Sequence, residues 1–175
     1  MSAEKQETDI KQASVKGFKV NPVDPDQTSI LCDFLEGIGI DHRGRRLDDV
    51  LAFDDIKAEQ THDFIQWLFP LDEVSRAVSG APVLSQTDIQ LIHTNSDAQA
   101  NIRRAAAWFL GFLERNDHWR TKYNHNHLRI TRVVKSLRLL TDDKEADKFK
   151  AAVFDLLGDD LDLIDRRAVE FWEGA

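Results

Sequence analysis

The stretch DAQANIRRAAAWFLGFLE, residues 97–114, decides the fold class of this chain. Alanine and leucine favour helix, and the apolar residues recur at the spacing of one helical face. That face consists of Ile102, Ala106, Phe109, Leu110 and Leu113. We therefore expect a long central helix. Gly111 costs this helix about 1 kcal/mol of propensity and suggests that another helix crosses closely there.

Periodic apolar stretches on both sides predict further helices, each bounded by capping residues, glycine or proline. Pro70 should end one of them, because proline disfavours helical geometry in the residue before it. No stretch alternates apolar and polar residues as a half-buried strand does. The additional helices are expected at about 28–36, 47–53, 55–69, 85–92, 128–140, 143–157 and 164–172. The sequence predicts an all-α, compact single-domain bundle of about seven to eight helices over residues 26–175, without significant sheet, behind a flexible or extended lead-in at residues 1–25.

The composition fits one soluble, cytoplasmic domain. The 175 residues are 42% hydrophobic, with four Trp and ten Phe, enough to build one core. Cys32 is the single cysteine, so no disulfide can form within the chain, and a reducing compartment suits it. No run approaches the roughly 20 apolar residues of a membrane span, and the polar N-terminus does not resemble a signal peptide.

The net charge of −8 argues against a nucleic-acid partner, because phosphate backbones are bound mainly by basic side chains. The charge is unevenly distributed. Residues 101–138 hold nine basic and two acidic residues, a charge of +7 that leaves −15 for the remainder. Either acidic helices neutralise this basic region within the fold, or part of it lines a pocket for an anionic ligand. The nine basic residues are Arg103, Arg104, Arg115, Arg120, Lys122, Arg129, Arg132, Lys135 and Arg138.

Two segments mix core residues with polar residues that packing alone does not require. They are HDFIQWLFP at 62–70 and NHNHLRITR at 124–132. In the first, the amide of Gln66 must find hydrogen-bond partners on an otherwise apolar helix or face a ligand. Trp67 is either a core indole with its N–H paired or the apolar wall of a pocket.

The second segment starts a helix, where free backbone N–H groups and the helix dipole favour anions. Asn124 or Asn126 can cap this helix, with the histidines packed against aromatic rings. Alternatively, an anionic group lies at the helix end, held by Arg129 and Arg132, which share a face. An internal ion pair of Arg132 with an acidic residue competes with this interpretation.

Glu59 and His62 have the i, i+3 spacing of ligands in di-iron bundles, but such a site needs a second copy, which the chain lacks. We therefore expect no metal and no cofactor, and a hydrogen bond from His62 to Glu59. The sequence also lacks a nucleophile elbow, a P-loop, a dinucleotide-binding glycine pattern and an HExxH motif, so no catalytic residue is assigned.

Together the two segments resemble the conserved domain of the opioid growth factor receptor family, whose members carry [FY]-I-Q-W-L-F-P and, later, H-N-x-L-R-I-T-R. The likeness runs from about Leu47 to Trp172 and indicates a short, stand-alone, bacterial member. In the animal receptor this domain is credited with binding an enkephalin peptide, and that protein is associated with nucleus and membrane. The resemblance thus implies a receptor-like module without assigning a chemistry.

We predict a binding module for a small anionic molecule or a peptide, with its polar pocket between the 55–69 helix and the start of the 128–140 helix. Its predicted residues are His62, Gln66, Trp67, His125, Asn126, Arg129 and Arg132. One alternative is an enzyme that uses His62 or His125 as general base in the same cleft. Another is a structural interaction module with an exposed apolar patch around Trp119 or Trp172. The sequence leaves the oligomeric state open.

Overall fold

The computed structural model describes residues 29–175 and confirms the all-α, single-domain prediction for them. This part of the chain has no β-sheet, only an isolated bridge between Leu71 and Val83. The expected lead-in at residues 1–25 lies outside the described residues. The helices are α1 (Ile30–Glu36), α2 (Leu47–Leu51), α3 (Asp55–Gln60), α4 (Ile65–Leu68), α5 (Gln86–Thr94), α6 (Ser96–Arg115), α7 (His125–Leu140), α8 (Asp143–Leu157), the 3-10 helix η1 (Gly158–Leu163) and α9 (Arg166–Glu173).

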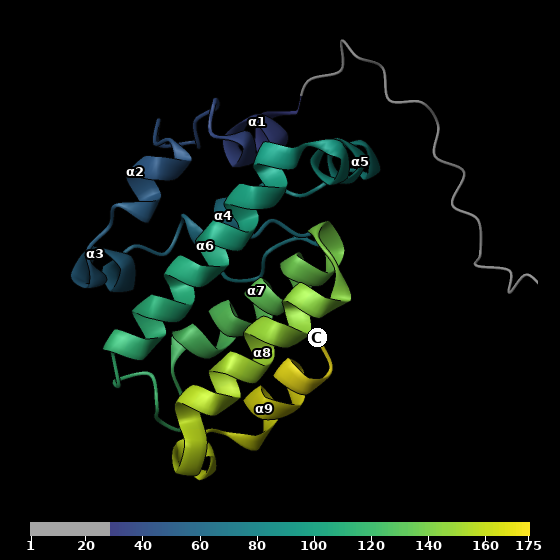
Figure 1. Cartoon of the computed structure of the whole chain (residues 1–175). Helices are drawn as coiled ribbons and strands as arrows, with labels where there is room; N and C mark the ends of the chain where they lie inside the picture. Colours follow the sequence, from purple (N-terminus) through teal and green to yellow (C-terminus); the bar gives the residue numbers. More distant parts are fainter. Residues whose placement is uncertain (1–28) are drawn as a thin grey trace, which may run out of the picture.

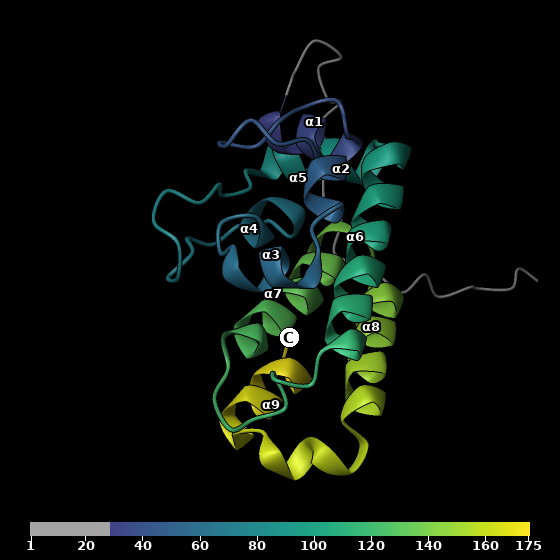
Figure 2. The same cartoon turned by 90° about the vertical axis from the view of Figure 1, so that its left-hand side faces the viewer.

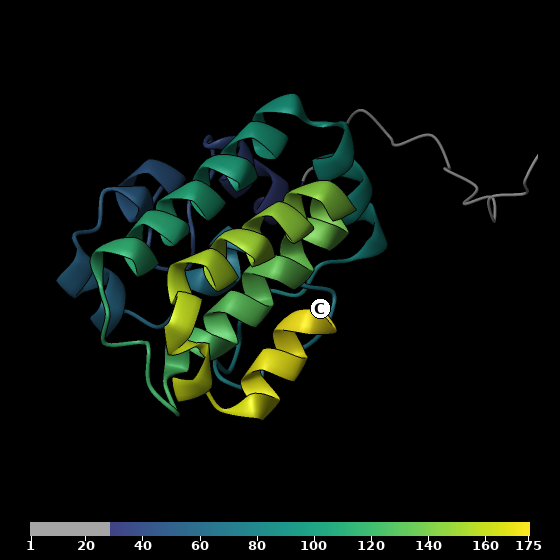
Figure 3. The same cartoon turned by 60° about the horizontal axis from the view of Figure 1, so that its bottom comes forward.

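The three longest helices, α6, α7 and α8, pack against one another and form the body of the domain (Figures 1 and 3). The helices α1 and α5 pack near the start of α6, and α9 packs against α7. The short α4 contacts α1. One continuous hydrophobic core joins all these elements, and Trp119 and Trp172 are fully buried in it.

Local sequence signals explain where the main helices begin and end. The side chain of Asn95 accepts hydrogen bonds from two N–H groups of the first turn of α6. Ser85 and Asp88 form the expected capping box of α5. Asn124 caps α7, which therefore begins at His125, three residues earlier than predicted.

The prediction of one helix over residues 55–69 is wrong. The structure has α3 and α4, separated by an irregular segment from Thr61 to Phe64. This split accounts for the ninth α-helix in the described residues. Two carbonyl groups at the break, those of Ala58 and Thr61, accept hydrogen bonds from the Arg129 side chain. In a continuous helix these carbonyls would accept hydrogen bonds from backbone N–H groups four residues later. Here the Arg129 side chain of α7 donates to them instead, and α3 ends.

A second expectation also fails. A Cβ atom at Gly111 would meet only Nη1 of Arg115, at 3.1 Å, so no other helix crosses closely there. By contrast Gly37, which ends α1, has φ +94°, in the left-handed region that glycine adopts without strain.

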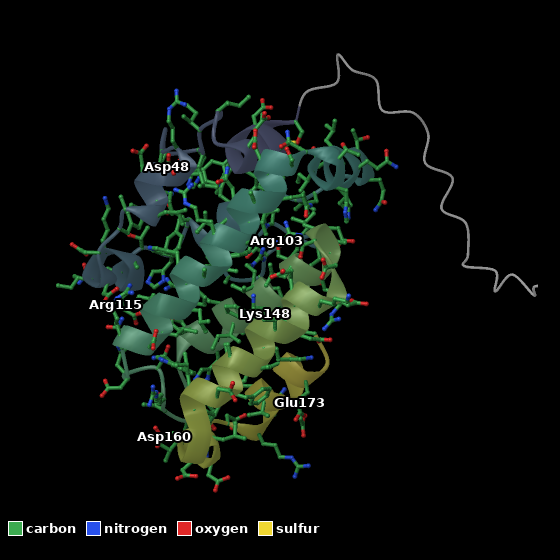
Figure 4. All side chains as sticks on the ribbon, in the orientation of Figure 1. Asp48, Arg103, Arg115, Lys148, Asp160 and Glu173 are labelled. Atoms are coloured by element: carbon green, nitrogen blue, oxygen red, sulfur yellow. The ribbon has the colours of Figure 1, made fainter. Side chains whose placement is uncertain are left out.

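Charged side chains cover the outside of the helices (Figure 4). Six of the nine basic residues between 101 and 138 lie within 4 Å of a carboxylate, so most of this region is neutralised inside the fold. The other three, Lys122, Arg129 and Arg132, have no such partner among residues 29–175. Within the same range, no helix has the length and apolar character needed to cross a lipid bilayer.

Candidate functional site: a basic cavity between α4 and α7

A cavity of about 300 Å³ lies between α4, the loop that follows it and one face of α7. Figure 2 shows that loop, residues 70–85, projecting beside α4. The size is at the lower end of the range for small-molecule sites. Fifteen residues line the cavity: His62, Ile65, Gln66, Leu71, Glu73, Ser75, Arg76, Ala77, Val78, His125, Leu128, Arg129, Thr131, Arg132 and Lys135.

The loop that forms the outer wall is tied at its two ends. Leu84 N–H donates to the carbonyl of Leu71 at 2.9 Å, beside the Leu71–Val83 bridge. Lys135 of α7 lies 2.9 Å from Glu73 and holds the loop against the helix. The wall is therefore fixed at its base, whereas Arg76 and Ala77 near its middle are exposed.

Arg129 forms part of the cavity floor and is only 5% exposed. Its guanidinium donates to the carbonyls of Ala58 at 3.1 Å and Thr61 at 2.7 Å, and to Oδ1 of Asn126 at 3.1 Å. A fourth bond, 3.3 Å long, reaches Nδ1 of His62. Burial lowers the pKa of Arg129 to about 10, although nearby Glu59 acts in the opposite direction. Arg129 thus stays charged at neutral pH, but most of its hydrogen-bonding capacity is already used within the protein.

Arg132, about one turn further along α7, makes fewer hydrogen bonds within the protein than Arg129 does. Its Nη1 donates to the carbonyl of Phe69 at 3.0 Å, its only hydrogen bond among the described residues. Burial lowers the pKa of Arg132, partly offset by the charge of Glu73. With Arg76, Arg129 and Lys135, the cavity has four basic residues against one carboxylate, a local charge of +3.

Gln66 lies on the α4 side of the cavity, and the residue is only 3% exposed. Its Oε1 atom is buried and has no hydrogen-bond partner. An unsatisfied buried acceptor costs about 1–3 kcal/mol, and this oxygen has almost no surface accessible from the cavity.

Three polar side chains surround the carboxylate of Glu59 at the edge of the cavity. Asn126 Nδ2 donates to Oε2 at 3.0 Å, while Nε2 of His118 and of His125 lie 3.1 and 3.3 Å from Oε1. The His125 contact lacks the alignment of a hydrogen bond. Burial raises the pKa of Glu59, but the hydrogen bonds from Asn126 and His118 outweigh this and leave it below its ordinary value. Glu59 is therefore a carboxylate at neutral pH.

His125 and His62 line the cavity together, with ring centroids 5.1 Å apart and the rings edge to face. Burial lowers the pKa of His125; Arg129 acts in the same direction and Glu59 opposes both. The expected bond from His62 to Glu59 is wrong, because His62 accepts from Arg129 instead. Nowhere in residues 29–175 do three or more His, Cys, Asp or Glu side chains form a group able to hold a metal.

The structure thus brings five of the seven predicted residues to one cavity and places two elsewhere. Trp67 does not line it: its indole N–H donates to Nδ1 of His42 at 3.0 Å, and its ring packs edge-on against Phe34. Asn126 is fully buried behind the wall, where it joins Glu59 to Arg129. The five that line the cavity are His62, Gln66, His125, Arg129 and Arg132.

Other lining residues were not predicted. Lys135 follows Arg132 by three residues, so helical spacing could have placed it on the same face. Arg76 and Val78 lie in an irregular loop, where periodicity gives no signal. A neighbouring hollow shares His125, Leu128 and Thr131 with the cavity. Its apolar rim, Tyr123, Leu128 and Phe171, is 74%, 63% and 58% exposed.

The family model described as the opioid growth factor receptor (OGFr) conserved region matches residues 47–167. This chain belongs to that family. The matched span runs from α2 into α9, so the whole cavity lies inside the OGFr conserved region.

Relatives in the OGFr family include the opioid growth factor receptors of human and mouse. The human protein is 33% identical over 100 residues, which is 45% of this chain and 14% of the receptor. The mouse protein is 31% identical over 97 residues, 45% of this chain and 15% of the receptor. The chain thus spans about one-seventh of the length of these relatives. No solved structure matches it.

Proposed function

We propose that this OGFr domain binds a small organic anion, or the anionic group of a peptide, in the cavity between α4 and α7. One observation carries the proposal: the buried Arg129 and the half-buried Arg132 bring positive charge to a cavity, with no carboxylate within 4 Å of either among residues 29–175. Buried charges are normally paired. An anionic ligand would supply the missing partner, and Arg132, with most of its donors uncommitted, would hold it.

The two remaining interpretations are less well supported. Trp119 and Trp172 are themselves buried, so an interaction surface near them would consist of Tyr123, Leu128 and Phe171 around the neighbouring hollow. The enzyme alternative is favoured by His125, which lines the cavity and lies 3.3 Å from Glu59; burial lowers the pKa of His125, so the imidazole is neutral at pH 7 and can accept a proton. It predicts that an ester probe bound in the cavity is hydrolysed by the wild type and not by a His125→Asn variant.

The relatives are named as receptors for opioid growth factor, so peptides belong among the probes. Cys32 is a buried free thiol, which suits the cytoplasmic location that we propose. A bacterial source stays a prediction of the sequence.

Isothermal titration with N-acetyl-L-leucine and its uncharged amide tests the binding proposal, with phenyl phosphate as a second anion. The acid should bind and the amide should not. Arg132→Gln should weaken binding roughly 10-fold or more, the loss of one charge-assisted hydrogen bond. The matched control is Arg166→Gln, on a side chain that is 92% exposed and outside the cavity, and it should bind as the wild type does. Equal binding of acid and amide, or no anion binding at all, would sink the proposal.

A further inference from the structure

Leu128 of α7 lines both the basic cavity and the neighbouring hollow. His125 and Thr131 are shared as well, so the two depressions adjoin along one face of α7. Residues four apart on a helix are neighbours, so Leu128 lies beside Arg132. The three side chains of the apolar rim are largely exposed, and a cluster of this kind marks a binding surface more often than a single exposed residue does. The apolar hollow is therefore continuous with the basic cavity.

The hollow offers apolar surface and few free hydrogen-bonding groups. Three of its polar side chains serve the fold: Asn124 caps α7, Asp165 caps α9, and Nε2 of His127 lies 2.9 Å from a backbone carbonyl. Its two other charged side chains, Lys122 and Arg167, are exposed cations. A peptide that crossed the hollow would find few partners for its N–H and C=O groups, whereas a hydrocarbon has no such groups to satisfy. The hollow therefore suits a hydrocarbon chain better than a peptide.

At the cavity end of this surface, two guanidinium groups retain unused donors. Arg132 donates only to the carbonyl of Phe69, and Arg76 of the loop makes no hydrogen bond or ion pair with any residue that the structure describes. The hydrogen bond and charge of Lys135 lower the pKa of Glu73, and the charges of Arg132 and Arg76 lower it further, so both arginines lie near that carboxylate. Because Lys135 already pairs with Glu73 at 2.9 Å, the two guanidinium groups are left to hold a carboxylate from outside.

We propose that the cavity and the hollow together bind an amphipathic organic anion, a free carboxylate with an extended hydrocarbon chain. Its carboxylate lies between Arg132 and Arg76, and its chain passes over Leu128 to the apolar rim of the hollow. From Arg132 to His125 at the start of α7 the helix rises about 10 Å, so a short carboxylate stays in the cavity and only a longer chain reaches the rim. The inference rests on the proposed function and names the ligand class for it.

Isothermal titration with butanoate, hexanoate, octanoate and decanoate, each below its micelle concentration, tests the inference. Each pair of added CH₂ groups that reaches the hollow should tighten binding about 4- to 15-fold, the range from half to full burial of the chain. Octanol has the same chain length as octanoate without its charge and should bind roughly 10-fold more weakly or worse. Octanol binding as tightly as octanoate would overturn the inference. If the four acids bind equally, the inference fails while the proposed function stands. If no anion binds, the proposed function itself fails.

Two variants locate the two ends of the ligand. Phe171→Ser should lower the ratio of decanoate to butanoate affinity by roughly 5-fold, because it removes a ring from the rim. The matched control is Ile56→Ser, on a side chain of α3 that is 69% exposed and outside both depressions, and it should keep the wild-type ratio. Arg132→Gln should weaken all four acids by the same factor.

Phe171 is 58% exposed, so the Phe171→Ser variant should melt at the wild-type temperature, and a thermal melt of each sample checks this. A wild-type ratio of decanoate to butanoate affinity in Phe171→Ser would overturn the inference. If the same change instead altered the oligomeric state in size-exclusion chromatography, the hollow would be an interface between copies of the chain.

Discussion

Replacing Arg129 by methionine should destabilise the domain without being the main determinant of ligand binding. The change removes the donor to four acceptors. Two of them, the Ala58 carbonyl and Asn126 Oδ1, are in buried hydrogen bonds. The other two, the Thr61 carbonyl and His62 Nδ1, are partly buried, and water can replace the guanidinium there. Two buried acceptors left unpaired cost about 2–6 kcal/mol together.

A second effect offsets part of this loss of stability. Burial lowers the pKa of Arg129 to about 10, which corresponds to about 3 kcal/mol of charge-burial cost that methionine does not carry. Subtracting this from 2–6 kcal/mol leaves a net loss of about 1 kcal/mol at the middle of the range, within limits of about −1 and 3 kcal/mol, so the melting temperature should fall by roughly 2–4 °C for a domain of this size. Arg132→Met removes a single hydrogen bond, to Phe69, and should cost less than about 1.5 kcal/mol.

Urea unfolding followed by tryptophan fluorescence measures both variants, because Trp119 and Trp172 are buried in the core. Titration with N-acetyl-L-leucine then shows which variant loses binding. We expect Arg129→Met to lose more stability and Arg132→Met more affinity. The reasoning is refuted if Arg129→Met has the same urea midpoint as the wild type yet no longer binds the probe. Arg129 would then be the main contact for the ligand.

Two further predictions concern stability. Gly111→Ala should raise the unfolding free energy by about 0.5–1 kcal/mol, because alanine is the better helix former. The nearby Arg115 side chain is 56% exposed and free to move away from the new methyl group. An unchanged or lower urea midpoint would mean that α6 needs glycine here. Burial lowers the pKa of His127 more than its hydrogen bond to the Trp119 carbonyl raises it, and burial also lowers that of His125. Below the ordinary histidine pKa of 6.5 the unfolded chain therefore takes up more protons than the folded one, so stability present at pH 7.5 should be lost toward pH 5.5. His127→Gln should flatten this dependence in urea melts at the two pH values, and an unchanged slope would contradict the assignment.

Most of the fold follows from local sequence, whereas the break between α3 and α4 does not. The apolar residues between 55 and 69 fit a helical period, but Ile56 turns out to be 69% exposed and does not belong to a buried stripe. The helix stops because Arg129, 68 residues further along than Thr61, takes the carbonyl groups that would continue it. No local pattern contains that information.

The candidate site was predictable in part for a similar reason. The basic residues at 129 and 132 and the amide at 66 stood out because each conflicts with its apolar surroundings. Trp67 was misplaced because its side chain lies against His42 and Phe34, away from the cavity that its neighbour Gln66 lines. The loop residues were missed because irregular backbone leaves no periodic signal, and their position depends on the Leu71–Val83 contact.

The tied base of the 70–85 loop has a consequence for how this family can diversify. The entropy of closing a loop grows only with the logarithm of its length, about 0.6 kcal/mol for each doubling. Because the Leu71–Leu84 hydrogen bond and the neighbouring bridge fix both ends, insertions between them should leave the helical core undisturbed. One wall of the cavity can therefore change in length and composition while the α7 wall stays constant, which would let related proteins accept occupants of different size around the same basic anchor.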